Sequence, residues 1–202
     1  MKKNIVVAGN IGSGKADLIR FLCSNYPLAP IAGIADENPY LDDFFTDMKR
    51  WAFHSQIFFL AKKFERFRKL STAFSSVIIS RTIHEDAEIF ARNLYQTRIM
   101  SETDFKTYYN FYLSLKDILP APDLLIYLHS PVSSMRKRLK ERNRPLDHLI
   151  SDSYLRRLNR LYVNWIADYD LSEVLIIDTK QHDFTSNLVD RADILESIER
   201  FI

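Results

Sequence analysis

A glycine-rich loop near the N-terminus constrains the fold more than any other stretch of this 202-residue chain. The apolar run 5–8 enters the loop, the spacing Gly9-x-x-x-x-Gly14-Lys15 forms it, and a helical pattern follows from Asp17. In a strand, loop and helix of this kind, backbone N–H groups surround phosphate oxygens and the lysine reaches the terminal phosphates. The loop therefore predicts phosphate binding. Ala16 departs from the pattern, which has Ser or Thr there to bind Mg²⁺.

The use of glycine supports this interpretation. The chain holds only four glycines, whereas average usage of ~7% would give about fourteen. Three of them, Gly9, Gly12 and Gly14, lie in the loop. Glycine is needed where φ is positive or where a ligand approaches the backbone closely. A plain strand–turn–helix connection without a ligand is the alternative, and the full spacing up to Lys15 argues against it.

Composition excludes several classes of protein. A net charge of +2 creates no overall field for nucleic acid or for a membrane surface. A single cysteine, Cys23, excludes an internal disulfide and fits a reducing compartment. No apolar run approaches the ~20 residues of a membrane span, and since no long apolar segment follows Met1-Lys2-Lys3 we expect no signal peptide. We expect one cytoplasmic domain over residues 1–202, with no nucleic acid or membrane partner.

Strand and helix patterns alternate along the chain. Strands are expected at 4–8, 28–34, 77–80, 124–128 and 174–177, and helices at 17–24, 49–70, 104–119, 132–142, 152–169 and 187–201, with one more carrying Ile89 and Leu94. This alternation predicts an α/β fold with a five-stranded parallel sheet and helices on both faces. Ligands of such sheets bind beyond the C-terminal ends of the strands. The glycine loop, Arg81 and Thr179 fall at that edge.

Two helices are unusually aromatic. The helix over 49–70 is apolar on more than one face, and the helix over 104–119 carries Phe105, Tyr108 and Phe111. The aromatics of the helix over 104–119 are more typical of a core or a dimer interface than of a base-stacking surface for nucleic acid. A helix that is apolar on several faces is buried against more than its own sheet. We therefore expect the two helices to form a dimer interface.

Three further stretches carry a family resemblance. They are Asp36-Glu37-Asn38-Pro39-Tyr40 continuing to Gln56, Ser80-Arg81-Thr82 continuing to Phe90, and Arg138 to Arg144. Together with the loop, they resemble the deoxynucleoside kinases over nearly the whole chain. This resemblance implies a P-loop kinase fold with a lid over about 138–150. It also implies transfer of the γ-phosphate of ATP-Mg²⁺ to the 5′-OH of a deoxynucleoside.

The resemblance assigns roles to individual residues. The ATP site would comprise Gly9, Asn10, Ile11, Gly12, Ser13, Gly14, Lys15 and Ala16, with Asp183 and Phe184 near the adenine. The deoxynucleoside site would comprise Gln56, Lys63, Asp86, Phe90 and, in a loosely aligned region, Asp147. The transferred phosphate would meet Arg81, Arg138, Arg142 and Arg144. Several arginine forks suit this role, because phosphoryl transfer consists mostly of positioning and charge neutralisation. A solvated helix face is the alternative for the lid arginines.

The chain also departs from the family pattern. Where the resemblance implies a general-base glutamate, Gly33 stands, and where it implies a carboxylate beside Mg²⁺, Ser80 stands. Ala16 replaces the Mg²⁺ hydroxyl, and Phe45 replaces a tyrosine that meets the sugar. No metal ligand is assigned.

These departures leave two functional hypotheses. The first is a nucleotide-binding member with weak or absent phosphotransfer, acting as a regulatory subunit or beside an active paralogue. The second is an active kinase with a rearranged site, in which Asp36 or Asp17 supplies the missing carboxylate. Some other P-loop small-molecule kinase is a third, less favoured interpretation. The sequence leaves the preferred base open, because a Gln and an acid can bind either a purine or a pyrimidine.

Overall fold

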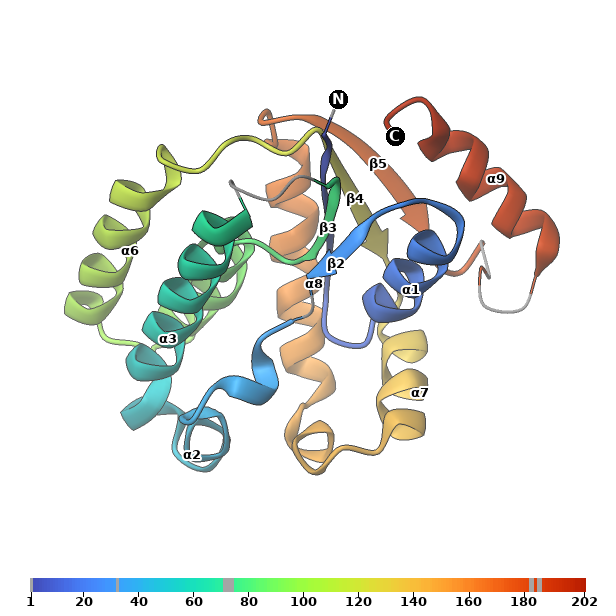
Figure 1. The fold of residues 1–202 in the computed structure, drawn as a ribbon. Helices are drawn as coiled ribbons and strands as arrows, with labels where there is room; N and C mark the ends of the chain where they lie inside the picture. Colours follow the sequence, from blue (N-terminus) through green and yellow to red (C-terminus); the bar gives the residue numbers. More distant parts are fainter. Residues whose placement is uncertain (1, 32, 71–74, 182–183, 185–186) are drawn as a thin grey trace.

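A parallel sheet of five strands forms the centre of the molecule (Figure 1). The computed structural model describes all residues except 1, 32, 71–74, 182–183 and 185–186. The strands run in the order β2-β3-β1-β4-β5. Their bounds are β1 Asn4–Gly9, β2 Ala29–Ile31, β3 Val77–Ser80, β4 Leu124–His129 and β5 Glu173–Asp178. The predicted α/β class and five-stranded parallel sheet are confirmed.

Helices cover the sheet and extend beyond it. The α-helices are α1 Lys15–Asn25, α2 Leu41–Thr46, α3 Met48–Leu70, α4 Ile83–Glu85, α5 Arg92–Gln96, α6 Glu102–Lys116, α7 Val132–Arg142, α8 Asp152–Ala167 and α9 Leu188–Glu199. Short 3₁₀ turns η1 (Ala35–Glu37) and η3 (Pro145–Leu149) and a π-helical segment η2 (Asp86–Ala91) complete the described elements. Among the described helices, none is long and apolar enough to cross a membrane.

Two predictions of local structure need correction. The strand expected over 28–34 is only three residues long, because β2 is an edge strand that pairs with β3 from Ala29↔Val77 to Ile31↔Ile79. Beyond this register β3 offers only one more residue before it ends at Ser80. The helix expected after β3 is divided by the π-helical segment η2, which periodicity did not predict.

Alternate strand residues build two cores, one on each face of the sheet. Ile5 and Val7 of β1 point toward α1 and α9, where they join a cluster with Leu18 and Ile194. Val6 and its neighbours on the other face pack against η2, α7 and α8. A parallel sheet buried on both faces holds its strand ends in fixed positions. The loops that follow these ends therefore emerge from a rigid base.

A helical body formed by α3, α4 and α6 extends past the β2 edge of the sheet (Figure 1). Leu60 of α3 and Tyr108 of α6 are both fully buried in it. Much of the apolar surface of α3 is therefore used inside this chain. The outer surface of α6 and the turn after it still expose Phe111 (46%) and Ile118 (65%).

Candidate active site

The glycine-rich loop joins β1 to α1 at the C-terminal edge of the sheet, as predicted. All three of its glycines have positive φ, at 144° for Gly9, 76° for Gly12 and 97° for Gly14. Gly9 is the most constrained, because a Cβ there would lie 2.8 Å from Ser13 Oγ and 2.9 Å from Leu128 O. The loop therefore has the tight backbone that phosphate binding requires.

Lys15 folds back onto the loop that carries it. Its Nζ donates to the carbonyl oxygens of Gly9 (2.8 Å) and Asn10 (2.7 Å), and to Ser13 Oγ (3.3 Å). Burial lowers the pKa of Lys15 well below its usual value, and the positive charge of Arg81 lowers it further. Three acceptors engage all three protons of an ammonium group. A phosphate entering the loop would replace these acceptors.

Other loop residues anchor the loop to the protein. The Asn10 side chain is buried, and its Nδ2 donates to Leu155 O (2.9 Å) and Asn159 Oδ1 (2.6 Å) of α8. The carbonyl of Ser13 accepts from Ser130 Oγ at 3.3 Å. Because the Asn10 side chain bonds α8, only the backbone of Asn10 is placed to contribute to the predicted phosphate binding.

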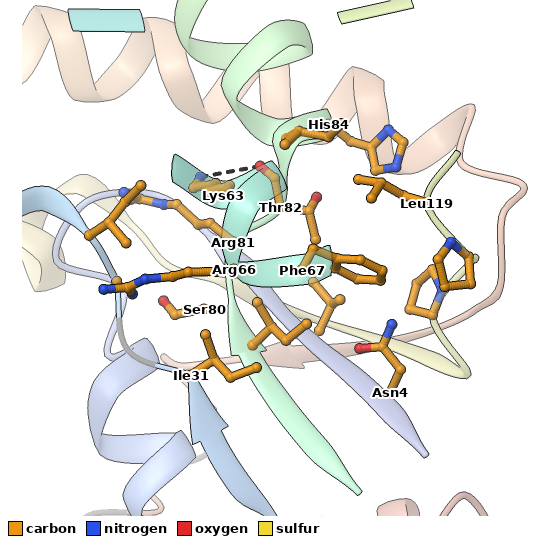
Figure 2. Close-up of a pocket in the computed structure, with 17 residues that line it drawn as sticks. Asn4, Ile31, Lys63, Arg66, Phe67, Ser80, Arg81, Thr82, His84 and Leu119 are labelled. Atoms are coloured by element: carbon orange, nitrogen blue, oxygen red, sulfur yellow. Dashed lines mark hydrogen bonds between the residues drawn. The ribbon is translucent and has the colours of Figure 1, made fainter. Parts of the chain in front are cut away.

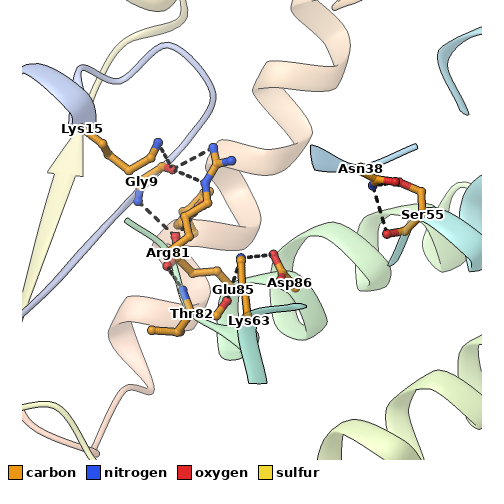
Figure 3. Close-up of polar contacts among 10 residues, drawn as sticks. Gly9, Lys15, Asn38, Ser55, Lys63, Arg81, Thr82, Glu85 and Asp86 are labelled. Atoms are coloured by element: carbon orange, nitrogen blue, oxygen red, sulfur yellow. Dashed lines mark hydrogen bonds and ion pairs between the residues drawn. The ribbon is translucent and has the colours of Figure 1, made fainter. Parts of the chain in front are cut away.

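Arg81 begins the connection after β3 and points at the loop (Figure 3). Its φ of 64° turns the chain at the strand end, and its Nε and Nη2 each lie 3.3 Å from Gly9 O. The guanidinium carbon sits 4.8 Å from the centre of the Phe90 ring. The structure thus brings together a predicted phosphate ligand, a predicted base-stacking aromatic and the loop.

Lys63, Gln56 and Asp86 form the deoxynucleoside end of the predicted site. Lys63 Nζ contacts Asp86 Oδ1 at 2.6 Å and Thr82 O at 3.2 Å. Gln56 and Asp86 are each only 4% exposed, so the alternative of an ordinary surface position does not hold for either. Gln56 Oε1 and Asp86 Oδ2 are buried acceptors without a partner among the described residues. Such atoms are costly unless a ligand donates to them.

The lid arginines contact three separate acceptors. Arg138 Nη1 lies 3.5 Å from Ser13 O, and Arg144 Nη1 lies 2.9 Å from Asp36 Oδ1. Arg142 forms a two-pronged pair with Asp147, with Nε 2.8 Å from Oδ2. Burial alone would raise the pKa of Asp147, but the hydrogen bonds and charge of Arg142 lower it overall. Asp147, assigned to the sugar by resemblance, is thus held inside the lid.

A pocket lies between α3 and the C-terminal part of β3 (Figure 2). Lys63, Arg66 and Arg81 bring positive charge to it, while Gly33 and Ser80 lie at its wall. Its described lining contains no acidic residue. Gln56, Asp86 and Phe90 do not line it, so it adjoins the predicted base end without coinciding with it.

Sequence reasoning assigned no role to Glu85, the buried last residue of α4. Glu85 Oε1 accepts from Gly9 N (3.3 Å) and from the Tyr162 hydroxyl (2.8 Å), while Oε2 accepts from Thr82 N (3.1 Å). The spacing Thr82-x-x-Glu85 is that of a helix capping box. That spacing could have indicated a capping role for Glu85 at the start of α4, but it does not predict the long-range contact with Gly9.

The remaining predicted residues lie on the far side of the loop. Phe184 is buried, and its Cζ lies 3.6 Å from the position of a Cβ on Gly14. Asp183, predicted beside it, falls outside the described residues. Within the described residues, no group of three or more His, Cys, Asp or Glu side chains could hold a metal ion.

Known proteins are similar to this chain in sequence and in fold. A profile of the family described as deoxynucleoside kinase matches residues 5–202. The deoxyadenosine/deoxycytidine kinase of Bacillus subtilis is 32% identical over 200 residues, covering 98% of this chain and 92% of its own. A deoxyguanosine kinase of Lactobacillus acidophilus is 36% identical over 203 residues, covering 96% of this chain and 88% of its own.

A solved structure has the same overall shape. The deoxyadenosine kinase of M. mycoides with bound dATP superimposes with a TM-score of 0.85 at 25% sequence identity. The match covers 97% of this chain and 99% of that one. These similarities establish that the chain belongs to the deoxynucleoside kinase family.

Proposed function

We propose that this family member binds a deoxynucleoside and ATP but transfers phosphate slowly or not at all. The observation that carries the proposal is the pocket whose described lining has no acidic residue, where Gly33 and Ser80 supply no carboxylate. The binding parts remain: a loop with three positive-φ glycines and two buried acceptors at the base end. Without a positioned base, a reaction of this kind loses roughly 10²–10⁴-fold in rate.

The metal side of the site supports the same proposal. Family kinases use ATP, typically with Mg²⁺, and this hard cation prefers oxygen ligands. Ala16, the second residue of α1, is exposed and has no side-chain oxygen, and Ser80 offers a single hydroxyl. The described residues contain no acidic cluster to replace them. The side chains present therefore do not fit a protein-held Mg²⁺.

Base recognition follows from the unpaired acceptors. Gln56 Oε1 and Asp86 Oδ2 need donors, and adenine, guanine and cytosine each carry an exocyclic amino group. Thymine has no amino group, so it would leave an acceptor unsatisfied, at a cost of about 1–3 kcal/mol. We propose deoxynucleosides with amino-bearing bases as the ligands. Such ligands, together with ATP, suit the cytoplasmic location that we also propose.

Calorimetric titration of the full chain with each of the four deoxynucleosides tests the binding proposal. Deoxyadenosine, deoxyguanosine or deoxycytidine should bind at least roughly tenfold more tightly than thymidine. Gln56→Leu, which is similar in size but has no acceptor, should reduce this preference. Thymidine binding as tight as the best of the other three would contradict the assignment of these acceptors.

An active kinase with a rearranged site is the second candidate, because Asp36 contacts Arg144 at 2.9 Å beside the lid. Asp36 belongs to η1, and its carboxylate contacts Arg144, which is predicted to bind the transferred phosphate. Asp17 is less suited, since it pairs with Arg20 on the exposed side of α1. If the protein turned over and Asp36→Asn abolished turnover while preserving binding, the second candidate would replace the first.

We further propose that the outer surface of α6 pairs with a second copy or with an active paralogue. Phe111 and Ile118 are large apolar side chains left exposed there, and α6 packs inward on α3 of the same chain. Light scattering at micromolar concentration should give the mass of a dimer for the wild type. Phe111→Glu should give the mass of a monomer, whereas Lys106→Glu, on an exposed part of the same helix, should not. A monomeric wild type would contradict self-pairing.

A further inference from the structure

We infer that Glu85 is a positioning residue that holds the phosphate loop ready for a nucleotide. Its three hydrogen bonds come from three separate segments: Gly9 of the loop, Thr82 before α4 and Tyr162 of α8. Every partner is a donor, so the side chain acts as an ionised carboxylate. This inference rests on the nucleotide-binding function proposed above.

The backbone of Gly9 links Glu85 to the two cations beside the loop, Lys15 and Arg81 (Figure 3). Its N–H donates to Glu85, while its carbonyl accepts from Lys15 at 2.8 Å and from Arg81 at 3.3 Å. Because a Cβ at Gly9 would collide with Ser13 and Leu128, the backbone has little room to adjust. Fixing the Gly9 N–H therefore also fixes the carbonyl on which the two cations meet.

Charge gives Glu85 a second role. Lys15 faces three cations, Arg81, Arg142 and Lys63, and Glu85 is the one acid that raises its pKa. Burial has the largest effect on the pKa of Glu85 and raises it overall, although the charges of Arg81, Lys63 and Lys15 act to lower it. The negative charge of Glu85 therefore stabilises both cations that donate to the Gly9 carbonyl, Lys15 and Arg81.

Glu85 is unsuited to act as a catalytic base. Both its oxygens already accept hydrogen bonds, Oε1 from two donors and Oε2 from one. The side chain is fully buried behind the loop. Its effect on a nucleotide must pass through Gly9 and Lys15, which is why we assign it a positioning role.

The test compares ADP binding by Glu85→Gln and the wild type in the full chain. Charged hydrogen bonds of this kind contribute roughly 10- to 100-fold to an equilibrium, so Glu85→Gln should weaken ADP binding by that factor. Deoxynucleoside binding should weaken less than ADP binding, because the three hydrogen bonds of Glu85 go to Gly9, Thr82 and Tyr162 and none goes to Gln56 or Asp86. Glu88→Gln is the matched control, because Glu88 lies on the same helical segment and bonds Tyr109 and Arg92 away from the loop. It should preserve ADP binding.

A pH profile of ADP binding separates positioning from simple helix capping. Removing Glu85 takes away the charge that raises the pKa of Lys15, so ADP affinity should begin to fall at a lower alkaline pH in Glu85→Gln. The charged and titratable groups facing this pair are Arg81, Lys63, Arg142, Tyr127, Tyr162 and Tyr169. Tyr162→Phe retains the carboxylate but removes one donor, so it should weaken ADP binding less without this alkaline shift.

The outcomes are distinct. Wild-type protein that binds no ADP would overturn both the proposed function and this inference. Wild-type protein that binds ADP, with Glu85→Gln binding equally well across pH, would overturn the inference alone. Equal losses of ADP and deoxynucleoside binding would also overturn it, by showing a purely structural role. If Glu85→Gln does not fold, Tyr162→Phe decides, because unchanged ADP binding in that variant would contradict the inference.

Discussion

Introducing Ala16→Ser, Gly33→Glu and Ser80→Asp together is expected to raise phosphotransfer at least about 100-fold over the wild type. A positioned general base contributes roughly 10²–10⁴-fold, and one electrostatic contact to the transition state roughly 10²–10³-fold. The three gains will not multiply, because such groups act as a unit. The measurement is the initial rate of deoxynucleoside monophosphate formation with saturating ATP-Mg²⁺.

The structure leaves room at two of the three positions, Gly33 and Ala16. A Cβ on Gly33 would meet no atom within 4 Å, and Gly33 borders the pocket that contains Ser80. Ala16 lies at an exposed position in the first turn of α1, next to Lys15. Adding Lys15→Ala to the triple variant is the control, and it should abolish the gain if the reaction uses the phosphate loop. A folded, ligand-binding triple variant with no gain would show that the three positions do not limit activity.

Replacing Gly9 with alanine should destabilise the protein by at least about 2 kcal/mol, since its φ of 144° disfavours any L side chain. The new Cβ would also lie 2.9 Å from the backbone oxygen of Leu128, which cannot move without disturbing β4. Because Lys15 and Arg81 both bond the Gly9 carbonyl, ADP binding should be lost as well.

Gly33→Ala provides the matched comparison for Gly9→Ala. Gly33 has no positive φ and open space around its Cβ position, so the same substitution should change stability by less than about 0.5 kcal/mol. Urea unfolding and ADP titration of both variants measure the contrast. Equal stability of the two variants would mean that the loop backbone is less constrained than its geometry indicates.

The sequence was sufficient to predict the sheet and the sheet edge at which the glycine-rich loop lies. Short apolar runs predicted the ends of the strands to within a residue or two, except at β2. The length of β2 depends on its pairing with the short β3. The loop glycines and Arg81 lie at the predicted edge because parallel strands end on one side. Local patterns carry this information, which is why it could be obtained without coordinates.

Long-range contacts could not be predicted in the same way. The π-helical turn that carries Asp86 and Phe90 has no periodicity of its own. The contact between Glu85 and Gly9 spans 76 positions, and Asn10 bonds α8 across 145. Such contacts depend on how the elements pack, which a single sequence does not specify.

The central claim is that the site binds its ligands without efficient transfer. The most direct measurement is the turnover of the wild-type protein with ATP-Mg²⁺ and each deoxynucleoside, at concentrations where calorimetry shows both ligands bound. We predict binding together with a rate far below the ~1 s⁻¹ at which ordinary kinases begin. A rate of about 1 s⁻¹ or more with any of the four deoxynucleosides would contradict the account.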